Sequence, residues 1–114
     1  MSSWQLITSL FVSGSYEIRP GNKMAYLTID DSPSADFLIK IEYLNRHEIP
    51  AIIFPKGEAI EDSPDKIQHA IRLGFVIGNH GYRHLRYSDL SLKQAREEIL
   101  RADRLIEDAY LWAA

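Results

Sequence analysis

The stretch MAYLTIDDSPS, residues 24–34, is a short apolar run that ends abruptly in two carboxylates. Residues 24–29 contain β-branched and aromatic side chains, and Gly21 and Asn22 precede them. This pattern predicts a buried strand of the kind found in parallel sheets. Asp30 and Asp31 would then lie just beyond the carboxyl end of that strand. In an extended chain, two adjacent side chains point to opposite faces, so the two carboxylates would do different jobs.

An amphipathic helix is expected next, over residues 35–48. Ser34 is its predicted N-cap, and Pro50 stops it. Residues 51–54, AIIF, predict a second buried strand, which should end at Pro55 because proline cannot donate to a sheet. The apolar residues of the predicted helix recur at intervals of three and four, and they include Phe37, Leu38, Ile41 and Leu44.

Residues 55–62 are expected to form a loop. Ser63 and Pro64 predict the start of a second helix, and Gly74 predicts its end. Residues 75–77 predict a third short strand. Ser91 and Gln94 then have the spacing of a capping box, which would open a long helix. The predicted inner face of that helix contains Ala95, Ile99, Ala102, Ile106 and Ala109.

Strands and helices therefore alternate three times along the chain. That order predicts an α/β fold with a parallel βαβαβα sheet and right-handed crossovers. We expect a domain over residues 24–114, preceded by an arm or strand over residues 1–23. Ligands bind at the carboxyl ends of the strands in such folds. Polar clusters follow all three predicted strands: DDS, PKGE and NHGYRH.

The composition narrows the functional classes. The chain has 114 residues, a formal net charge of -3 and no cysteine. Disulfide and thiol chemistry are therefore excluded, and the lack of a basic stripe argues against a nucleic-acid partner. No run approaches the roughly 18 apolar residues of a membrane span. The N-terminal residues lack the positive region of a signal peptide, which favours the cytoplasm without excluding secretion.

His80 and His84 lie four residues apart after the third predicted strand. Neutral imidazole is a common metal ligand, but two surface histidines would show the same spacing. Likewise, Asp30 and Asp31 fit a turn as well as a metal site. Taken together, one carboxylate and two imidazoles at the same rim of the sheet form a three-ligand set suited to Zn²⁺, Fe²⁺ or a related divalent ion. A second aspartate beside that carboxylate could act as a base.

Other candidates carry less weight. His47 and His69 are expected to be solvated or half-buried structural residues. Arg83 and Arg86 could line a substrate groove, although arginines in loops are usually just exposed.

Three stretches resemble motifs of the polysaccharide deacetylases, the NodB-homology domain of carbohydrate esterase family four. TIDDSPS at 28–34 resembles that family's TFDDGP motif, and GFVIGNHGYRH at 74–84 resembles its second motif, in which two histidines flank a Ser or Thr and two further residues. PAIIFPKG at 50–57 is similar to the strand between them. The resemblance covers residues 24–110 and implies the first half of an irregular (β/α) barrel.

The resemblance also implies roles. Asp31, His80 and His84 would hold a divalent metal, with zinc the expected ion, and Asp30 would act as general base. The reaction would remove N-acetyl groups from an acetylated glycan, with water as the nucleophile. The metal would polarise the acetamide carbonyl.

The sequence departs from the family pattern in several places. Ser32 replaces a glycine, which would cost stability if that turn has a positive φ. Gly81 replaces the Ser or Thr between the histidines, so a hydroxyl that braces the loop is missing. The later motifs, with an arginine that orients the base and a histidine that acts as acid, have no counterpart in residues 85–114. The alternative is therefore a catalytically incomplete homologue that binds a metal or a glycan, and self-association could cover its open sheet edge.

Overall fold

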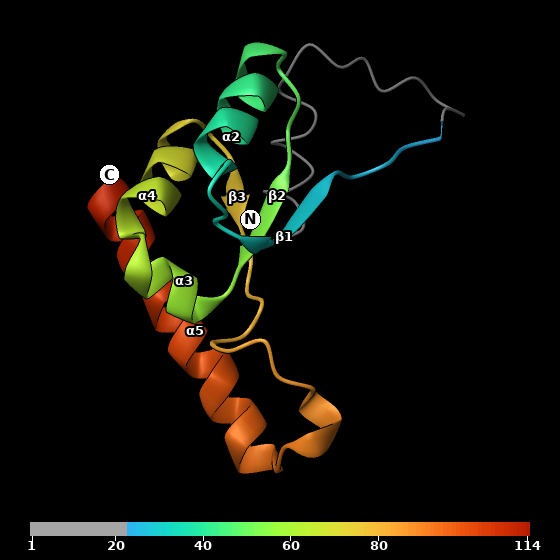
Figure 1. Ribbon diagram of the computed structural model, residues 1–114, viewed down its shortest axis with the longest axis vertical. Helices are drawn as coiled ribbons and strands as arrows, with labels where there is room; N and C mark the ends of the chain where they lie inside the picture. Colours follow the sequence, from blue (N-terminus) through green and yellow to red (C-terminus); the bar gives the residue numbers. More distant parts are fainter. Residues whose placement is uncertain (1–22) are drawn as a thin grey trace, which may run out of the picture.

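The computed structural model describes residues 23–114 and shows a parallel sheet flanked by helices (Figure 1). The predicted α/β class and parallel sheet are confirmed. The arm predicted over residues 1–23 falls almost entirely outside the described residues. In the described part of the chain, the three strands lie in the order β1-β2-β3. They are β1 (Thr28–Ser32), β2 (Ile52–Pro55) and β3 (Val76–Ile77).

One long helix packs along two shorter helices. The longest helix, α5, packs against α3 and α4, on the side of the molecule away from β1 (Figure 1). None of the helices in residues 23–114 combines the length and apolar composition that a membrane crossing requires. The helical segments are α2 (Phe37–Arg46), α3 (Gly57–Asp62), α4 (Pro64–Arg72), the 3-10 turn η1 (Tyr87–Asp89) and α5 (Leu92–Ala113).

The core forms where β2 meets the helices. Ile53 of β2 is fully buried, and Phe37 and Ile41 of α2 and Ile67 of α4 are buried with it. Burial of each such side chain stabilises the fold by about 1.5–3 kcal/mol. The core thus fixes β2 as the central strand, with β1 on one side of it and β3 on the other.

The first strand differs from its prediction. It begins at Thr28 rather than Met24, and it contains Asp30 and Asp31 instead of ending before them. Met24 and Leu27 are substantially exposed, so the prediction of a buried strand over 24–29 was wrong. The physical reason is that β1 pairs only with β2 in the described structure, and that pairing starts opposite Ile52.

Local signals predicted some helix ends well and others poorly. Gly74 follows α4 with a φ of +95°, and Ser91 forms the predicted capping box with Gln94. Ser34, by contrast, is not the N-cap of α2; that position belongs to Asp36. The loop predicted over residues 55–62 was also wrong, because most of it forms α3.

Helix α3 forms because a distant loop supplies its hydrogen-bond partners. The first N–H groups of a helix have no acceptor within the helix itself. Here the N–H of Gly57 donates to the carbonyl of Gly81 at 2.8 Å, and that of Glu58 donates to the carbonyl of Tyr82 at 3.0 Å. A helix of six residues is marginal alone, and this tertiary contact was not visible in the local sequence.

Candidate metal centre

Three side chains from two distant segments converge at the carboxyl end of the sheet. Asp31 lies in β1, and His80 and His84 lie in the segment after β3. The Oδ1 atom of Asp31 is 3.0 Å from Nε2 of His80 and 3.4 Å from Nε2 of His84. One ligand atom from each residue lies within 4.8 Å of the other two. The convergence expected from the sequence is therefore present in the structure.

The backbone of β1 turns Asp31 out of the regular strand. Its φ is +57°, in the left-handed region that Asp tolerates better than most residues. Asp30 pairs with Phe54 and Ser32 with Pro55, so Asp31 is an extra residue opposite the β2 ladder. Such a bulge re-aims a side chain. The simple alternation expected for Asp30 and Asp31 in an extended chain therefore does not apply.

Ser32 occupies a different environment from the one expected. The positive φ lies at Asp31 and not at Ser32, so the expected backbone cost of Ser at that position does not arise. The side chain of Ser32 is 3% exposed, and its hydroxyl oxygen has no hydrogen-bond partner in the structure. Its burial beside Asp31 shows that the end of β1 is a packed part of the molecule.

Residues 79–86, which we call the histidine loop, are docked on α3 by their backbone. The carbonyls of Gly81 and Tyr82 accept from the first turn of α3, as described above. The N–H of Gly81 donates to Oδ1 of Asn79 at 2.8 Å. Gly81 itself has a φ of +78°. The peptide groups between the two histidines are therefore fixed by specific partners.

The histidine loop is also bound to α5, through Arg83 and Glu98. The N–H of Arg83 donates to one oxygen of Glu98 at 2.7 Å, and its Nε donates to the other at 2.8 Å. Glu98 is only 5% exposed. Burial raises the pKa of Glu98, but the hydrogen bonds and positive charge of Arg83 outweigh that effect and hold the pKa below its usual value.

Sequence reasoning missed this pair. Glu98 lies three residues after Ala95 and four before Ala102, so it falls on the predicted inner face of α5. An acid in the middle of an apolar stripe needs a partner. That signal was available, but only the fold identifies Arg83 as the partner.

A second polar cluster binds the loop through Tyr82. Its hydroxyl donates to Oε2 of Glu61 in α3, and the guanidinium of Arg101 lies 3.6 Å from the centre of its ring. The hydrogen bond to Glu61 is the main reason that the pKa of Tyr82 is raised. This cluster joins the loop to α3 and α5 together.

A cavity of about 530 Å³ lies beside the two histidines. Arg83 lines this cavity and Arg86 does not; a role for Arg83 in binding substrate stays a prediction. The remaining lining residues are Asn79, His80, Gly81, His84, Leu85, Tyr87 and Ile99. The cavity is open to solvent beside His80 and His84, two of the three converging residues.

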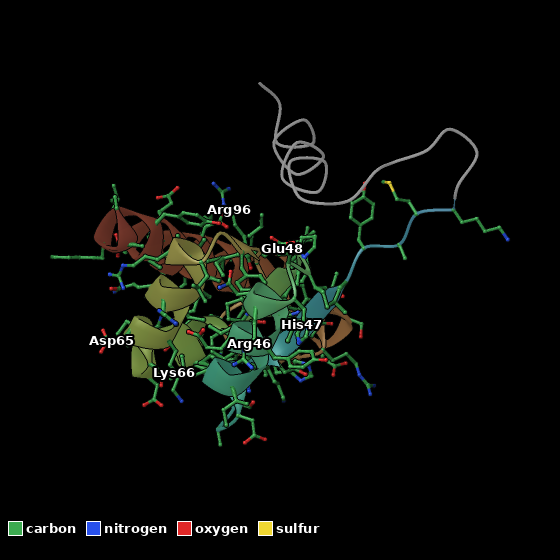
Figure 2. The ribbon with its side chains drawn as sticks, turned by 90° about the horizontal axis from the view of Figure 1, so that it is seen from above. Arg46, His47, Glu48, Asp65, Lys66 and Arg96 are labelled. Carbon is green, nitrogen blue, oxygen red and sulfur yellow. The ribbon has the colours of Figure 1, made fainter. Side chains whose placement is uncertain are left out.

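The other two histidines lie away from this centre. His69 of α4 is paired with Glu42 of α2, with 2.6 Å between Nε2 and Oε1. His47 follows the last residue of α2, next to Arg46 (Figure 2). Both fit the structural role expected for them.

Comparison with known proteins agrees with the geometry. Residues 17–111 match the family model for polysaccharide deacetylases. The chain is 32% identical over 81 residues to a peptidoglycan-N-acetylglucosamine deacetylase of Bacillus cereus. The aligned region covers 70% of this chain and 30% of the relative.

Two solved structures have a similar fold. A family 4 carbohydrate esterase from Streptomyces lividans, in complex with acetate, is 27% identical with a TM-score of 0.74, covering 78% of this chain and 46% of that one. A mutant family pseudoenzyme with restored enzymatic activity is 29% identical with a TM-score of 0.73, covering 80% and 34%. The chain thus spans less than half of each of these proteins. On its sequence motifs, its fold and the family match, the chain belongs to the polysaccharide deacetylase family.

Proposed function

We propose that Asp31, His80 and His84 bind a divalent metal ion, zinc, and that the chain takes part in removing N-acetyl groups from a glycan. The observation that carries this proposal is the convergence of one carboxylate and two imidazoles, which arrive from segments 49 residues apart. This donor set is one that catalytic zinc uses, since three protein ligands leave a position open for water.

The spacing of the donor atoms supports a fit to zinc. With zinc–ligand bonds of about 2.0–2.1 Å, the ligands of a tetrahedral site lie roughly 3.3 Å apart. The separations of 3.0 and 3.4 Å between Asp31 and the histidines lie close to that value. The site also faces solvent, so an ion could enter without unfolding the loop.

Asp30 is the proposed general base. Hydrolysis of an acetamide adds water across the C–N bond and releases acetate and a free amine. A bound divalent ion would supply Lewis-acid activation of the water and the carbonyl. Asp30 would take the proton of the attacking water, because it is an exposed carboxylate adjacent in the chain to Asp31.

The substrate class follows from the family and from the named relative. The Bacillus cereus relative is a deacetylase of N-acetylglucosamine in peptidoglycan. An N-acetylated glycan is therefore the substrate that we propose. The cavity beside the histidines gives such a group a place to approach the site.

Zinc titration by calorimetry tests the metal site first. We expect binding near 1:1 in the wild type and none in His80→Ala. His47→Ala is the matched control, since it removes an exposed histidine away from the site and should leave binding unchanged. A wild-type protein with no affinity for zinc above background would refute the proposal.

A catalytically incomplete binding module is the second candidate. It is favoured by the sequence, because residues 85–114 contain no counterpart of the family's later motifs. A measurement of acetate release from acetylated chito-oligomers distinguishes the enzyme from the binding module. Turnover that is lost in Asp30→Asn, while zinc binding remains, supports the enzyme; zinc or glycan binding without acetate release supports the module. Self-association across the edge of β1 stays a prediction, which sedimentation velocity can check.

A further inference from the structure

Arg83 occupies a special place in the histidine loop, because it lies between the two histidines of the proposed metal site. Its backbone N–H and its side chain both bind the carboxylate of Glu98. A third contact, 2.7 Å from a terminal guanidinium nitrogen to Oε1, completes the pair. A rotation of the backbone at Arg83 would break one of these contacts. The carboxylate therefore restrains the peptide that separates His80 from His84.

Glu98 is itself held in place by its burial on the inner face of α5, two turns from the start of the helix. An apolar residue at this position would continue the inner face of the helix without the cost of desolvating a charge. The acid supplies what an apolar residue cannot, which is directional bonds to a main-chain amide and a guanidinium. The arrangement is thus suited to fixing the position of the loop, beyond merely attaching it to the helix.

The other side of His80 is bound to the same helix. The side-chain amide of Asn79 donates to the carbonyl of Ile99 at 2.9 Å and to Oδ1 of Asp103 at 2.6 Å. His80 therefore lies between two residues that are each anchored on α5. Helix α5 can therefore control where the histidines lie through Asn79 and Arg83, without contacting the three converging side chains.

We propose that Glu98 is a positioning residue for the metal site, which acts through Arg83 to hold the Nε2 atoms of His80 and His84 within reach of Asp31. This inference rests on the proposed metal-binding function. In this proposal, Glu98 contacts neither the substrate nor the three metal ligands. In this chain the Arg83–Glu98 pair would brace the loop, where Gly81 provides no hydroxyl to do so.

The test measures zinc affinity in a graded series at position 98. Changes to residues that orient metal ligands typically weaken metal binding about 10–100-fold. We expect a loss in this range for Glu98→Ala and a smaller loss for Glu98→Gln, which keeps an acceptor oxygen. Arg83→Ala removes only the side-chain contacts of a residue whose side chain is largely exposed, and it provides a folded variant if Glu98→Ala does not fold.

Tyr110→Phe is the matched control on the same helix. The hydroxyl of Tyr110 accepts from the N–H of Ile77 at 3.0 Å, so this variant loosens α5 from β3 without touching the histidine loop. We expect its zinc affinity to stay within about twofold of the wild type, even where its melting temperature falls. A purely structural role for Glu98 would make the two variants alike at equal loss of stability.

Amide hydrogen exchange in metal-free protein provides a second readout. Glu98→Ala should speed exchange at the amide of Arg83 and across residues 79–86, and Tyr110→Phe should not. Unchanged exchange in folded Glu98→Ala, or zinc affinity equal to the wild type, would overturn the inference. If the wild type binds no zinc, the metal-site proposal fails, and the exchange data alone then decide whether Glu98 positions the loop.

Discussion

At the scale of single residues, the candidate site depends on positions with an unusual backbone conformation or an unusual degree of burial. Asp31 and Gly81 both have positive φ values, and Glu98 is a buried acid. Each departure is tied to the position of a proposed ligand. Asp31 is re-aimed by its bulge, Gly81 lets the loop turn after His80, and Glu98 binds the loop through Arg83. These positions are where substitutions should have effects that composition alone would not suggest.

Replacing Gly81 by serine, the type of residue that the family motif has there, should destabilise this chain. A left-handed backbone costs a residue with a Cβ about 1–2 kcal/mol. The added Cβ would also come within 2.5 Å of the hydroxyl oxygen of Tyr87, although that side chain can move. Urea unfolding measures the loss. Gly74→Ser is the control, because Gly74 has φ +95° and no atom within 4 Å of an added Cβ.

The comparison separates two causes. Equal losses in the two variants mean that backbone conformation alone is responsible. A larger loss at Gly81 that Tyr87→Phe relieves identifies the contact with the hydroxyl. A Gly81→Ser variant as stable as the wild type would contradict the prediction.

The stability contributed by Glu98 should depend on pH in a defined direction. Its pKa is lowered in the folded protein, from an ordinary value of 4.5, chiefly by the bonds from Arg83 that outweigh burial. A carboxyl group with a lowered folded pKa stabilises the fold above its unfolded pKa, and this contribution is lost as the pH falls through the folded pKa. The wild type should therefore exceed Glu98→Gln in stability most clearly near pH 7.

Urea midpoints measured from pH 7 down to pH 3 check this expectation. The difference between wild type and Glu98→Gln should shrink as the pH falls below about 4.5. A difference that grew on acidification would show that the sign is wrong.

At the scale of elements, the helices differ in how much of their stability is local. The start of α5 is specified within four residues by the capping box of Ser91 and Gln94. The start of α3 is specified by carbonyls more than 20 residues further along the chain. Helix α5 should therefore respond to changes in its own first turn, and α3 to changes in the histidine loop.

Ser91→Ala should lower stability by about 1 kcal/mol, because it removes the side-chain acceptor for the N–H of Gln94. Thermal or urea unfolding measures this loss. Ser63→Ala is a matched control: Ser63 is the N-cap of α4, but its side chain makes no capping hydrogen bond. We expect a clearly smaller effect there. Equal effects at both serines would mean that the capping bond contributes little.

At the scale of the whole molecule, the proposed metal would join two parts of the chain whose strands are both paired with β2. Asp31 belongs to β1 and the two histidines follow β3, and these strands are both neighbours of β2 and not of each other. An ion bound to all three residues would add a link across the end of the sheet. Binding that requires the folded arrangement must stabilise the fold.

Zinc should therefore raise the thermal stability of the chain. At a free concentration 100 times its Kd, the gain is about 2.7 kcal/mol. Differential scanning calorimetry with and without zinc measures it, and a chelator should reverse it. Asp31→Asn should abolish most of the gain. A melting temperature indifferent to zinc in the wild type would contradict this prediction.

Much of this arrangement could be predicted from short stretches of sequence. The α/β order, the parallel sheet, the end of α4 at Gly74 and the capping box at Ser91 all depend on residues close together in the chain. The rule that parallel strands carry ligands at their carboxyl ends grouped one of the two aspartates with His80 and His84, and the resemblance to the deacetylases identified that aspartate as Asp31. Besides the N-cap of α2, the main failures were the position of β1, the helix α3 and the Arg83–Glu98 pair.

These failures share one physical reason. Periodicity, caps and turn residues act over a few residues, so the sequence by itself determined the order of elements and the residues available for a site. The start of β1, the existence of α3 and the burial of Glu98 depend on hydrogen bonds between segments that only folding brings together. The tertiary structure alone decided those partners, and with them the positions of the two histidines.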